Sequence, residues 1–331
     1  MRDKKLITIQ VPCYNEENNV EPMACRLVNI MSTLPQYDYE IIFRNNASTD
    51  NTIYRLRELA KSNPHIKVIS NARNYGLDPM KDTFDGRMSG DAIIYIPCDF
   101  QEPPELIPEY IAWWEKGYEV VVAQKIASKE GKLKYFLRQI FYKIIASFSE
   151  IQQVDNMSGI FLISKRVSDI WRKSNRDELF RYFITDLGID IKIIQYVQEK
   201  RRSGKSSFGV RKLFSYALTS LVTTTSVPLR IATVLGFVSA IISFFIGVIY
   251  LILKLIFWNR FSTGTAPLLI GMFFIASVQL LFIGLLGEYV NMILRKVTPN
   301  NPPIVNELIN FDNIDEDPLY FKKPRQDAES K

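Results

Sequence analysis

A strand and then a helix are predicted within LITIQVPCYNEENNVEPMACRLVNIMS, residues 6–32. The strand is the short apolar run Leu6–Val11, and the helix covers Asn15–Ser32. The same order repeats along the chain, with strands at Tyr39–Phe43, Ile66–Ser70, Ala92–Ile96 and Glu119–Ala123 and helices at Asp50–Lys61, Gly76–Met88 and Pro104–Lys116. Short apolar strands that alternate with helices indicate an α/β fold, in which helices cover both faces of a mostly parallel sheet.

The composition excludes several kinds of site. The chain has 331 residues, with 3 cysteines and 1 histidine. The absence of a C-x-x-C pair argues against a disulfide scaffold and a thiolate zinc site, and the single His65 leaves no material for a histidine-based triad. Such cysteine usage fits the reducing cytoplasm, and the polar start of the chain predicts no signal peptide. The net charge of +6 suits a phosphorylated substrate, an anionic membrane or nucleic acid, without choosing among them.

Two long uncharged runs predict a membrane anchor. Ile231–Leu253 and Phe261–Gly287 are each as long as the roughly 20 apolar residues that span a bilayer. Buried core helices are the alternative, but they seldom stay apolar on every face over such a length. We therefore predict two transmembrane helices, 231–253 and 266–290 within residues 230–296, joined as a hairpin. More lysine and arginine flank the outer ends of the two spans, at 211, 212, 230, 295 and 296, than their connecting loop, which has Arg260 with Lys254 at its edge. Both termini are therefore expected in the cytoplasm.

The rest of the chain divides around this hairpin. Residues 1–208 form the predicted cytoplasmic α/β domain, 209–229 a juxtamembrane amphipathic helix, and 297–331 a cytoplasmic tail with little fold of its own. Apolar stripes with basic flanks at 133–148 and 210–222 fit either the membrane interface or packing on the sheet. Glycines in the two predicted spans allow helices to approach closely, which also permits a homo-oligomer.

Polar clusters follow four consecutive predicted strands. They are Pro12–Glu17, Arg44–Thr52, Asn71–Gly76 and Pro97–Glu105. Ligands of such sheets bind beyond the carboxyl ends of the strands, so we expect the four clusters to meet at one rim. A further basic stretch rich in glycine and serine, Arg201–Ser207, suits phosphate binding or an electrostatic contact with anionic lipid.

The order of these clusters resembles that of the family 2 glycosyltransferases with the GT-A fold. The family's patterns P-x-Y-N-E-E, D-D-G-S-T-D, R-N-x-G and D-x-D-L-Q-D-P-P-E align with residues 12–17, 45–50, 73–76 and 97–105. With the predicted hairpin, the chain resembles the polyisoprenyl-phosphate glycosyltransferases, such as dolichyl-phosphate mannose synthases and bactoprenol glucosyltransferases.

The resemblance implies both a fold and a reaction. The fold is a Rossmann-like, mostly parallel sheet, and the reaction is hexosyl transfer with inversion. The sugar moves from a nucleotide diphosphate sugar, for which a UDP-sugar is expected, to polyprenyl phosphate. The expected place is the cytoplasmic face of the cell inner (plasma) membrane, in surface polysaccharide synthesis, with Mg²⁺ or Mn²⁺ as cofactor and no nucleic acid partner.

The resemblance also implies roles for individual residues. Asp99 is the expected metal ligand and catalytic carboxylate, with Glu102 as a second ligand, and the alternative for Asp99 is an acid at a helix N-terminus. Ser48, Thr49 or Asp50 is also expected to cap a helix. The nucleotide is expected to contact Pro12, Tyr14, Asn15, Glu16, Asn46, Ser48, Asp50, Asn74 and Gly76. The phosphates and the acceptor are expected to contact Arg201, Arg202, Lys205, Ser206 and Ser207.

Three places depart from the family's patterns. Asn45-Asn46 stand where the pattern has two aspartates, Pro97 replaces the first aspartate of D-x-D, and Gly159 stands where many relatives carry a candidate base. A phosphate acceptor is already anionic and can react without a base, so we expect a lipid phosphate acceptor. Asp155 is the nearby substitute where a base is required.

Two alternatives stay open. Transfer to the hydroxyl of a lipid-linked sugar needs a base, for which Asp155, Glu102 and Asp99 are the candidates. The other is a catalytically degenerate transferase that serves as a membrane scaffold. The three departures favour the scaffold, whereas the intact Asp99 and Arg201–Ser207 oppose it.

Overall fold

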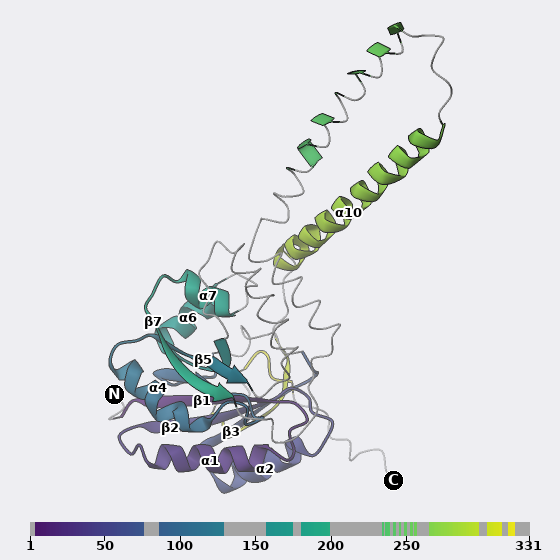
Figure 1. The fold of residues 1–331 in the computed structure, drawn as a ribbon. Helices are drawn as coiled ribbons and strands as arrows, with labels where there is room; N and C mark the ends of the chain where they lie inside the picture. The colour runs from purple at the N-terminus through teal and green to yellow at the C-terminus, as the bar shows by residue number, and fades with distance from the viewer. Residues whose placement is uncertain are drawn as a thin grey trace, which may run out of the picture. The chain divides into compact units, whose positions relative to one another are not determined.

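The computed structural model has an α/β fold built on one sheet (Figure 1). It describes residues 4–75, 86–128, 157–174, 180–198, single positions between 234 and 256, 265–297, 303–312 and 317–321. Within these residues the sheet has 8 strands in the order β7-β5-β6-β4-β1-β2-β3-β8. Their bounds are β1 Leu6–Cys13, β2 Asp38–Asn45, β3 Ile66–Asn71, β4 Ala92–Tyr95, β5 Val120–Ser128, β6 Met157–Ser164, β7 Ile191–Gln198 and β8 Val305–Ile309.

Most neighbouring strands of the sheet are parallel. The pairs β1–β2, β1–β4, β2–β3 and β5–β7 are parallel. Strand β6 is antiparallel to β4 and β5, and β8 is antiparallel to β3. The predicted mostly parallel α/β sheet is therefore confirmed, although β6, β7 and β8 were not among the predicted strands.

Helices pack on both faces of the sheet because its strands are apolar on both sides. In β2, Ile41 and Phe43 belong to one core cluster, and Ile42 between them belongs to the other. Successive side chains of a strand point to opposite faces, so such a continuous apolar run is typical of a strand that is buried twice. The first cluster includes residues of α1 (Val20–Ser32), α2 (Thr52–Ser62) and α4 (Ile107–Glu115), and the second includes residues of α6 (Lys165–Lys173) and α7 (Phe180–Asp186).

The predicted helices begin later than the sequence suggests. Helix α1 begins at Val20 rather than at Asn15, because the backbone at Asn15 has a φ of 56°, outside the helical region. The helix predicted at Pro104 begins as a short 3₁₀ turn, η1 (Pro104–Leu106), and continues as α4. The helix predicted for Gly76–Met88 lies mostly outside the described residues, and Gly86–Met88 are not helical.

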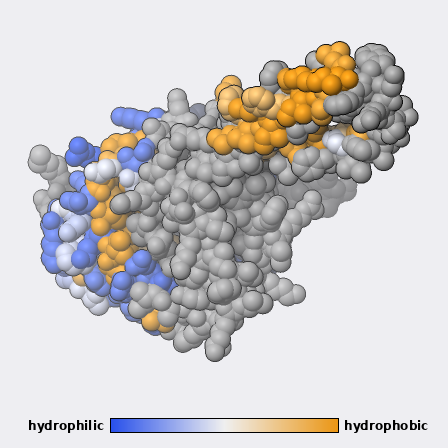
Figure 2. All heavy atoms as spheres, turned by 45° about the horizontal axis from the view of Figure 1, so that its top comes forward, coloured by the Kyte–Doolittle hydropathy of each residue, from blue (hydrophilic) through white to orange (hydrophobic). Residues whose placement is uncertain are grey.

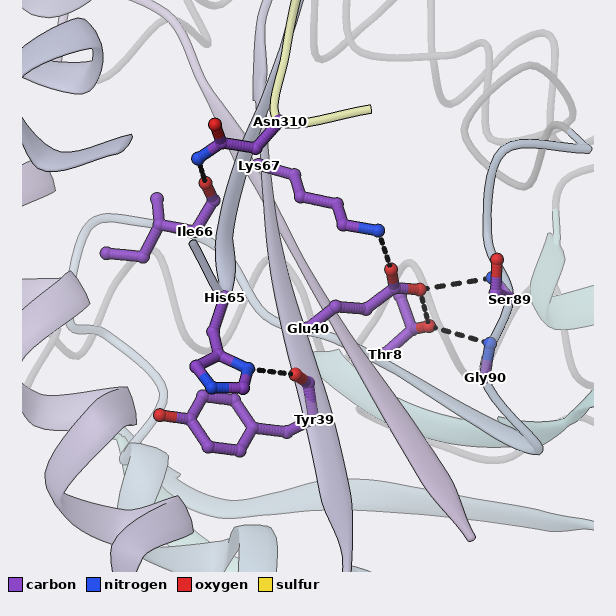
Figure 3. Close-up of polar contacts among 9 residues, drawn as sticks. All are labelled: Thr8, Tyr39, Glu40, His65, Ile66, Lys67, Ser89, Gly90 and Asn310. Atoms are coloured by element: carbon purple, nitrogen blue, oxygen red, sulfur yellow. Dashed lines mark hydrogen bonds and ion pairs between the residues drawn. The ribbon is translucent and has the colours of Figure 1, made fainter. Parts of the chain in front are cut away.

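A buried carboxylate ties the middle of the sheet together (Figure 3). Glu40 in β2 is only 3% exposed. Its Oε1 accepts hydrogen bonds from Thr8 Oγ1 (2.5 Å) in β1 and from the backbone N–H of Ser89 (3.1 Å). Its Oε2 pairs with Lys67 Nζ (2.7 Å) in β3. Gly90 N–H donates to Thr8 Oγ1, and a Cβ atom at Gly90 would lie 2.5 Å from that oxygen. The cluster thus links three strands to the segment before β4, and only glycine fits at position 90.

The C-terminal segment was expected to carry little fold of its own, and this expectation was wrong. Val305–Ile309 form β8, which pairs with β3 at the edge of the sheet. Val305 is fully buried, and Asn310 donates a hydrogen bond to the carbonyl of Ala60. Asn310 also donates to the carbonyl of Ile66 (Figure 3). The strand forms here because the otherwise open edge of β3 offers backbone partners to a short, partly polar segment.

The chain separates into two compact units. Unit 1 comprises residues 1–144, 151–207 and 300–331, and unit 2 comprises residues 145–150 and 208–299. Unit 2 contains α10 (Thr265–Val297), over which apolar side chains gather (Figure 2). Those that are exposed include Leu268, Leu280, Ile283, Leu286 and Leu294. Among the residues that the structure describes, we find no helix with the length and apolarity needed to cross a membrane. The two spans stay a prediction.

Candidate active site at the carboxyl ends of the strands

The loops after β1 and β2 meet at the carboxyl end of the sheet, as the parallel register requires. Cys13, the last residue of β1, lies opposite Asn45, the last residue of β2. The backbone N–H of Asn46 donates to the carbonyl of Cys13 (3.0 Å). Strand β4 flanks β1 on its other side, so the loop after β4 leaves the same edge. The strand-end clusters of β1, β2 and β4 therefore share one rim.

Hydrogen bonds fix the loop after β1 against the loop after β2. Asn15 N–H donates to Ser48 Oγ (3.0 Å), and Asn15 Oδ1 accepts from Thr49 N–H (2.8 Å). Glu16 N–H donates to Thr52 Oγ1 (2.9 Å). Thr52 received no role from the sequence pattern, yet its hydroxyl joins the two loops. These hydrogen bonds between backbone N–H groups and side-chain oxygens fix both loops. The outer atoms of the loops therefore form a preorganised surface for a ligand.

Asp50 organises the start of α2. Its Oδ1 accepts from the backbone N–H of Thr52 (3.0 Å), and its Oδ2 accepts from Glu17 N–H (3.3 Å). The N-cap of α2 is Asn51, so the expectation that Ser48, Thr49 or Asp50 occupies this position was wrong. Asp50, one residue earlier, still accepts a hydrogen bond from the first N–H of the helix. The carboxylate of Glu16 is buried and accepts from Asn19 Nδ2, so this side chain shapes the loop from inside. Tyr14 is 40% exposed at the rim, and Pro12 lies within β1.

Asn46 connects the loop after β2 to the loop after β3. Its Oδ1 accepts from Asn71 Nδ2 (3.1 Å) and from the backbone N–H of Tyr75 (3.1 Å), and its Nδ2 donates to Asn74 Oδ1 (3.1 Å). Asn74 and Asn46, both expected to contact the nucleotide, are thus neighbours. No individual role was predicted for Asn71 and Tyr75, because their contacts with Asn46 depend on the pairing of β2 with β3.

Burial explains the asparagine at position 45. Asn45 is only 2% exposed, its Nδ2 donates to Ser70 Oγ (3.0 Å), and its Oδ1 accepts from Ser48 N–H (3.1 Å). A buried carboxylate without a cation would pay a large desolvation cost, whereas a neutral amide uses both a donor and an acceptor here. The first departure from the family's pattern is therefore compatible with an intact rim.

A buried carboxyl group lies beside Asp99 at the end of β4. Glu102 is 6% exposed, and its Oε1 accepts from Gly159 N–H (3.3 Å) in β6 and from the Tyr196 hydroxyl (3.5 Å) in β7. Burial, and secondarily the negative charge of Asp99, raise the pKa of Glu102 to about 7. Glu102 thus joins the loop after β4 to two strands that the sequence did not reveal.

Pro97 and Gly159, two of the three departures from the family's pattern, lie in close contact. A Cβ atom at position 159 would lie 2.9 Å from Pro97 Cγ and 3.4 Å from Glu102 Oε1. Carbon atoms pack best at about 3.5–4.0 Å, so a side chain at position 159 would push into the proline ring. The two replacements form a matched pair, which we call the Pro97–Gly159 contact.

Asp99 is the residue best placed to hold a divalent cation. Its side chain is partly exposed, and its Oδ1 accepts from the backbone N–H of Gln101 (3.2 Å). Within the described part of the chain, no group of three or more His, Cys, Asp or Glu side chains could enclose a metal ion. Mg²⁺ is commonly held by one or two carboxylates together with substrate phosphates, and Asp99 fits such a site.

Two cysteines near the rim and the predicted site residues not yet placed complete the description. Cys13 and Cys98 are buried next to the rim, and burial raises the pKa of both thiols, so neither is a thiolate nucleophile. The other predicted site residues lie outside the described residues, and the structure neither joins them to the rim nor separates them from it. These are Gly76, Asp155, Arg201, Arg202, Lys205, Ser206 and Ser207.

The chain is similar in sequence to known glycosyltransferases. Residues 8–171 match the family model for glycosyl transferase family 2. A bactoprenol glucosyl transferase derived from the SfII prophage of Shigella flexneri is 33% identical over 301 residues, which are 90% of this chain and 96% of that protein. A prophage bactoprenol glucosyl transferase homolog of Escherichia coli is 32% identical over 286 residues, 86% of this chain and 93% of that protein.

Solved structures resemble the chain more distantly. A mannosyltransferase from Pyrobaculum calidifontis, solved in complex with GDP-Man and Mn²⁺, is 14% identical, with a TM-score of 0.44. The match covers 66% of this chain and 62% of the mannosyltransferase.

Proposed function

The chain belongs to glycosyl transferase family 2, and we propose that it transfers a hexose from a nucleotide diphosphate sugar to polyprenyl phosphate. The observation that carries this proposal is the Pro97–Gly159 contact, which leaves no room for an acid where many relatives carry a candidate base. In support, two relatives that match most of the chain are named for bactoprenol glucosyl transfer.

The donor half of the proposal rests on the rim of the sheet. Tyr14, Asn46 and Asp50 come from the loops after β1 and β2. Hydrogen bonds join the two loops and fix the side chains of Asn46 and Asp50. Glu16 supports this surface from inside. Asp99 would hold Mg²⁺ or Mn²⁺, which would neutralise the diphosphate of the donor. We place the donor's nucleotide over the loops after β1, β2 and β3 and its diphosphate toward Asp99.

The acceptor half of the proposal follows from charge. An oxygen of polyprenyl phosphate attacks the anomeric carbon of the donor sugar, and the bond from that carbon to the nucleotide diphosphate breaks with inversion. The nucleotide diphosphate departs with the bonding electrons. The attacking oxygen is anionic at neutral pH, so this chain needs to position it and to offset its charge rather than to remove a proton. Arg201, Arg202 and Lys205 are our proposed phosphate contacts.

A second acceptor class is favoured by one observation. The carboxyl group of Glu102 is buried beside Asp99, and its raised pKa of about 7 is suited to a general base. Transfer to the hydroxyl of a lipid-linked sugar would require such a base. The hydrogen bonds from Gly159 and Tyr196 hold this carboxyl inside the protein, which is why we rank the phosphate acceptor first.

We place the enzyme in the inner (plasma) membrane, with the α/β unit and both termini in the cytoplasm. The support is the two uncharged runs Ile231–Leu253 and Phe261–Gly287, the basic residues on their outer sides, and the exposed apolar side chains of α10. A lipid acceptor also requires a site at the bilayer surface. Surface polysaccharide synthesis is the process in which we expect the product to be used.

The experiment is a transfer assay with two acceptors. Purified protein in detergent is incubated with MgCl₂ or MnCl₂, a panel of nucleotide sugars, and either undecaprenyl phosphate or an undecaprenyl-linked sugar, and lipid products are identified by mass spectrometry. We expect a glycosylated lipid phosphate with one donor. A product from the lipid-linked sugar alone would overturn the acceptor assignment, and no product from either acceptor would overturn the proposed function.

A further inference from the structure

The C-terminal strand β8 lies next to the part of the rim that we assign to the donor nucleotide. Its first paired residue, Val305, lies opposite Asn71, the last residue of β3. The pairing continues past the strand, because Ala72 N–H donates to the carbonyl of Ile304 (2.8 Å). The beginning of β8 is therefore bonded to the loop after β3, which contains Arg73, Asn74 and Tyr75.

Tyr75 joins β8 to the nucleotide residues. Its hydroxyl accepts a hydrogen bond from the backbone N–H of Ile304 (3.0 Å), and its own backbone N–H donates to Asn46 Oδ1 (3.1 Å). The guanidinium carbon of Arg73 lies 4.2 Å from the centroid of the Tyr75 ring, in cation–π contact. Tyr75 thus connects three groups: its hydroxyl binds the backbone just before β8, its ring contacts Arg73, and its backbone N–H binds the amide of Asn46.

Several contacts along its length hold β8 in place. Glu307 forms two hydrogen bonds of 2.7 Å with Arg57 of α2, and Val305 is fully buried. Asn310 binds the carbonyls of Ala60 and Ile66 near the start of β3, at the opposite end of that strand from Asn71. A strand rises by about 3.3 Å per residue, so this anchor is on the order of 15 Å from the rim.

We propose that β8 is a positioning element of the donor site, which sets Tyr75 and, through it, Asn46 and Arg73 for the donor's nucleotide and phosphates. This inference rests on the proposed function, because it takes the rim to be the donor site. It gives the C-terminal strand a role beyond closing the edge of the sheet. The nucleotide should bind more weakly whenever β8 is loosened, even by a change that lies far from the rim.

Two substitutions loosen β8 from its two ends. Tyr75→Phe keeps the ring under Arg73 and removes only the oxygen that accepts from Ile304. Asn310→Gly removes the far anchor, and glycine tolerates the φ of 61° at this position. The matched control is Tyr37→Phe, which removes the hydroxyl that donates to Glu115 Oε1 (3.1 Å) away from the rim.

The experiment measures nucleotide binding by full-length protein in detergent, with UDP and GDP as probes in the presence of MnCl₂. For the nucleotide that binds, we expect the dissociation constant to rise roughly two- to tenfold in Tyr75→Phe and in Asn310→Gly, the effect of losing one or two hydrogen bonds. Tyr37→Phe should bind like the wild type. Hydrogen exchange at the amide of Ile304 should become faster in both β8 variants, with or without nucleotide.

The outcomes separate this inference from the function on which it rests. Wild-type protein that binds neither UDP nor GDP would overturn the donor site, and the inference with it. Wild-type protein that binds, together with both β8 variants that bind equally well, would overturn the inference alone. Faster exchange at Ile304 without weaker binding would show that β8 is structural only.

Discussion

The Pro97–Gly159 contact makes a quantitative prediction for Gly159→Ala. The new Cβ atom would lie 2.9 Å from Pro97 Cγ, about 0.6 Å or more inside the best packing distance of two carbon atoms. Overpacking of this kind costs about 1–3 kcal/mol, whereas replacing glycine by alanine within a strand otherwise stabilises by roughly 0.5–1 kcal/mol. We therefore expect Gly159→Ala to lower the free energy of unfolding by about 1–2 kcal/mol.

A double-mutant cycle assigns this loss to the proline ring. Urea unfolding is measured for the wild type, Gly159→Ala, Pro97→Ala and the double variant, with tryptophan fluorescence as the signal. In the Pro97→Ala background the ring is absent, so Gly159→Ala should be neutral or slightly stabilising, with a coupling of at least about 1 kcal/mol. A Gly159→Ala variant as stable as the wild type, or an equal loss in both backgrounds, would refute the idea that the two replacements compensate one another.

Three further predictions concern charged groups. Burial raises the pKa of Glu102 from 4.5 to about 7, so the folded state binds its proton more tightly and stability falls as pH rises between these values. This fall in the free energy of unfolding is on the order of 3 kcal/mol, and Glu102→Gln should remove most of it. The measurement is urea unfolding with EDTA at pH 5 and pH 8, and Glu109→Gln, at an exposed position, should leave the fall unchanged. Asp99→Asn should abolish transfer and the dependence of UDP or GDP binding on Mn²⁺ while leaving the melting temperature within a few degrees, and unchanged metal dependence would contradict its role. Lys67→Met should destabilise by about 3 kcal/mol because it leaves the Glu40 carboxylate buried without its cation, and adding Glu40→Gln should restore part of the loss.

The sequence predicts the centre of the sheet well because the signal there is local. Strands β1 to β4 are apolar runs followed by turn residues, and their parallel order alone requires their ends to share a rim. The rim residues Asn15, Asn46 and Asp50 could therefore be placed near one another before their contacts were known. The start of α1 was placed too early, because a positive φ at Asn15 leaves no trace in the pattern of apolar residues.

The edges of the sheet and the neighbours of Glu102 could not be predicted in the same way. Strand β8 has only five residues, and its backbone partner β3 is more than 230 positions earlier in the chain. The contacts of Gly159 with Pro97 and of Tyr196 with Glu102 join residues that only the finished sheet brings together. Pro97 and Gly159 can therefore be recognised in the sequence as departures from the family's pattern, but their contact with one another is visible only in the structure.

The chemical linkage of the transferred sugar decides between a lipid phosphate and a sugar hydroxyl as the acceptor. The donor that supports transfer is supplied with ¹³C at the anomeric carbon, undecaprenyl phosphate is the acceptor, and the purified lipid product is examined by ¹³C and ³¹P NMR. We expect a phosphodiester in which the labelled carbon couples to phosphorus, with the anomeric configuration opposite to that of the donor. A labelled carbon without coupling to phosphorus, or a product with the donor's configuration, would contradict it.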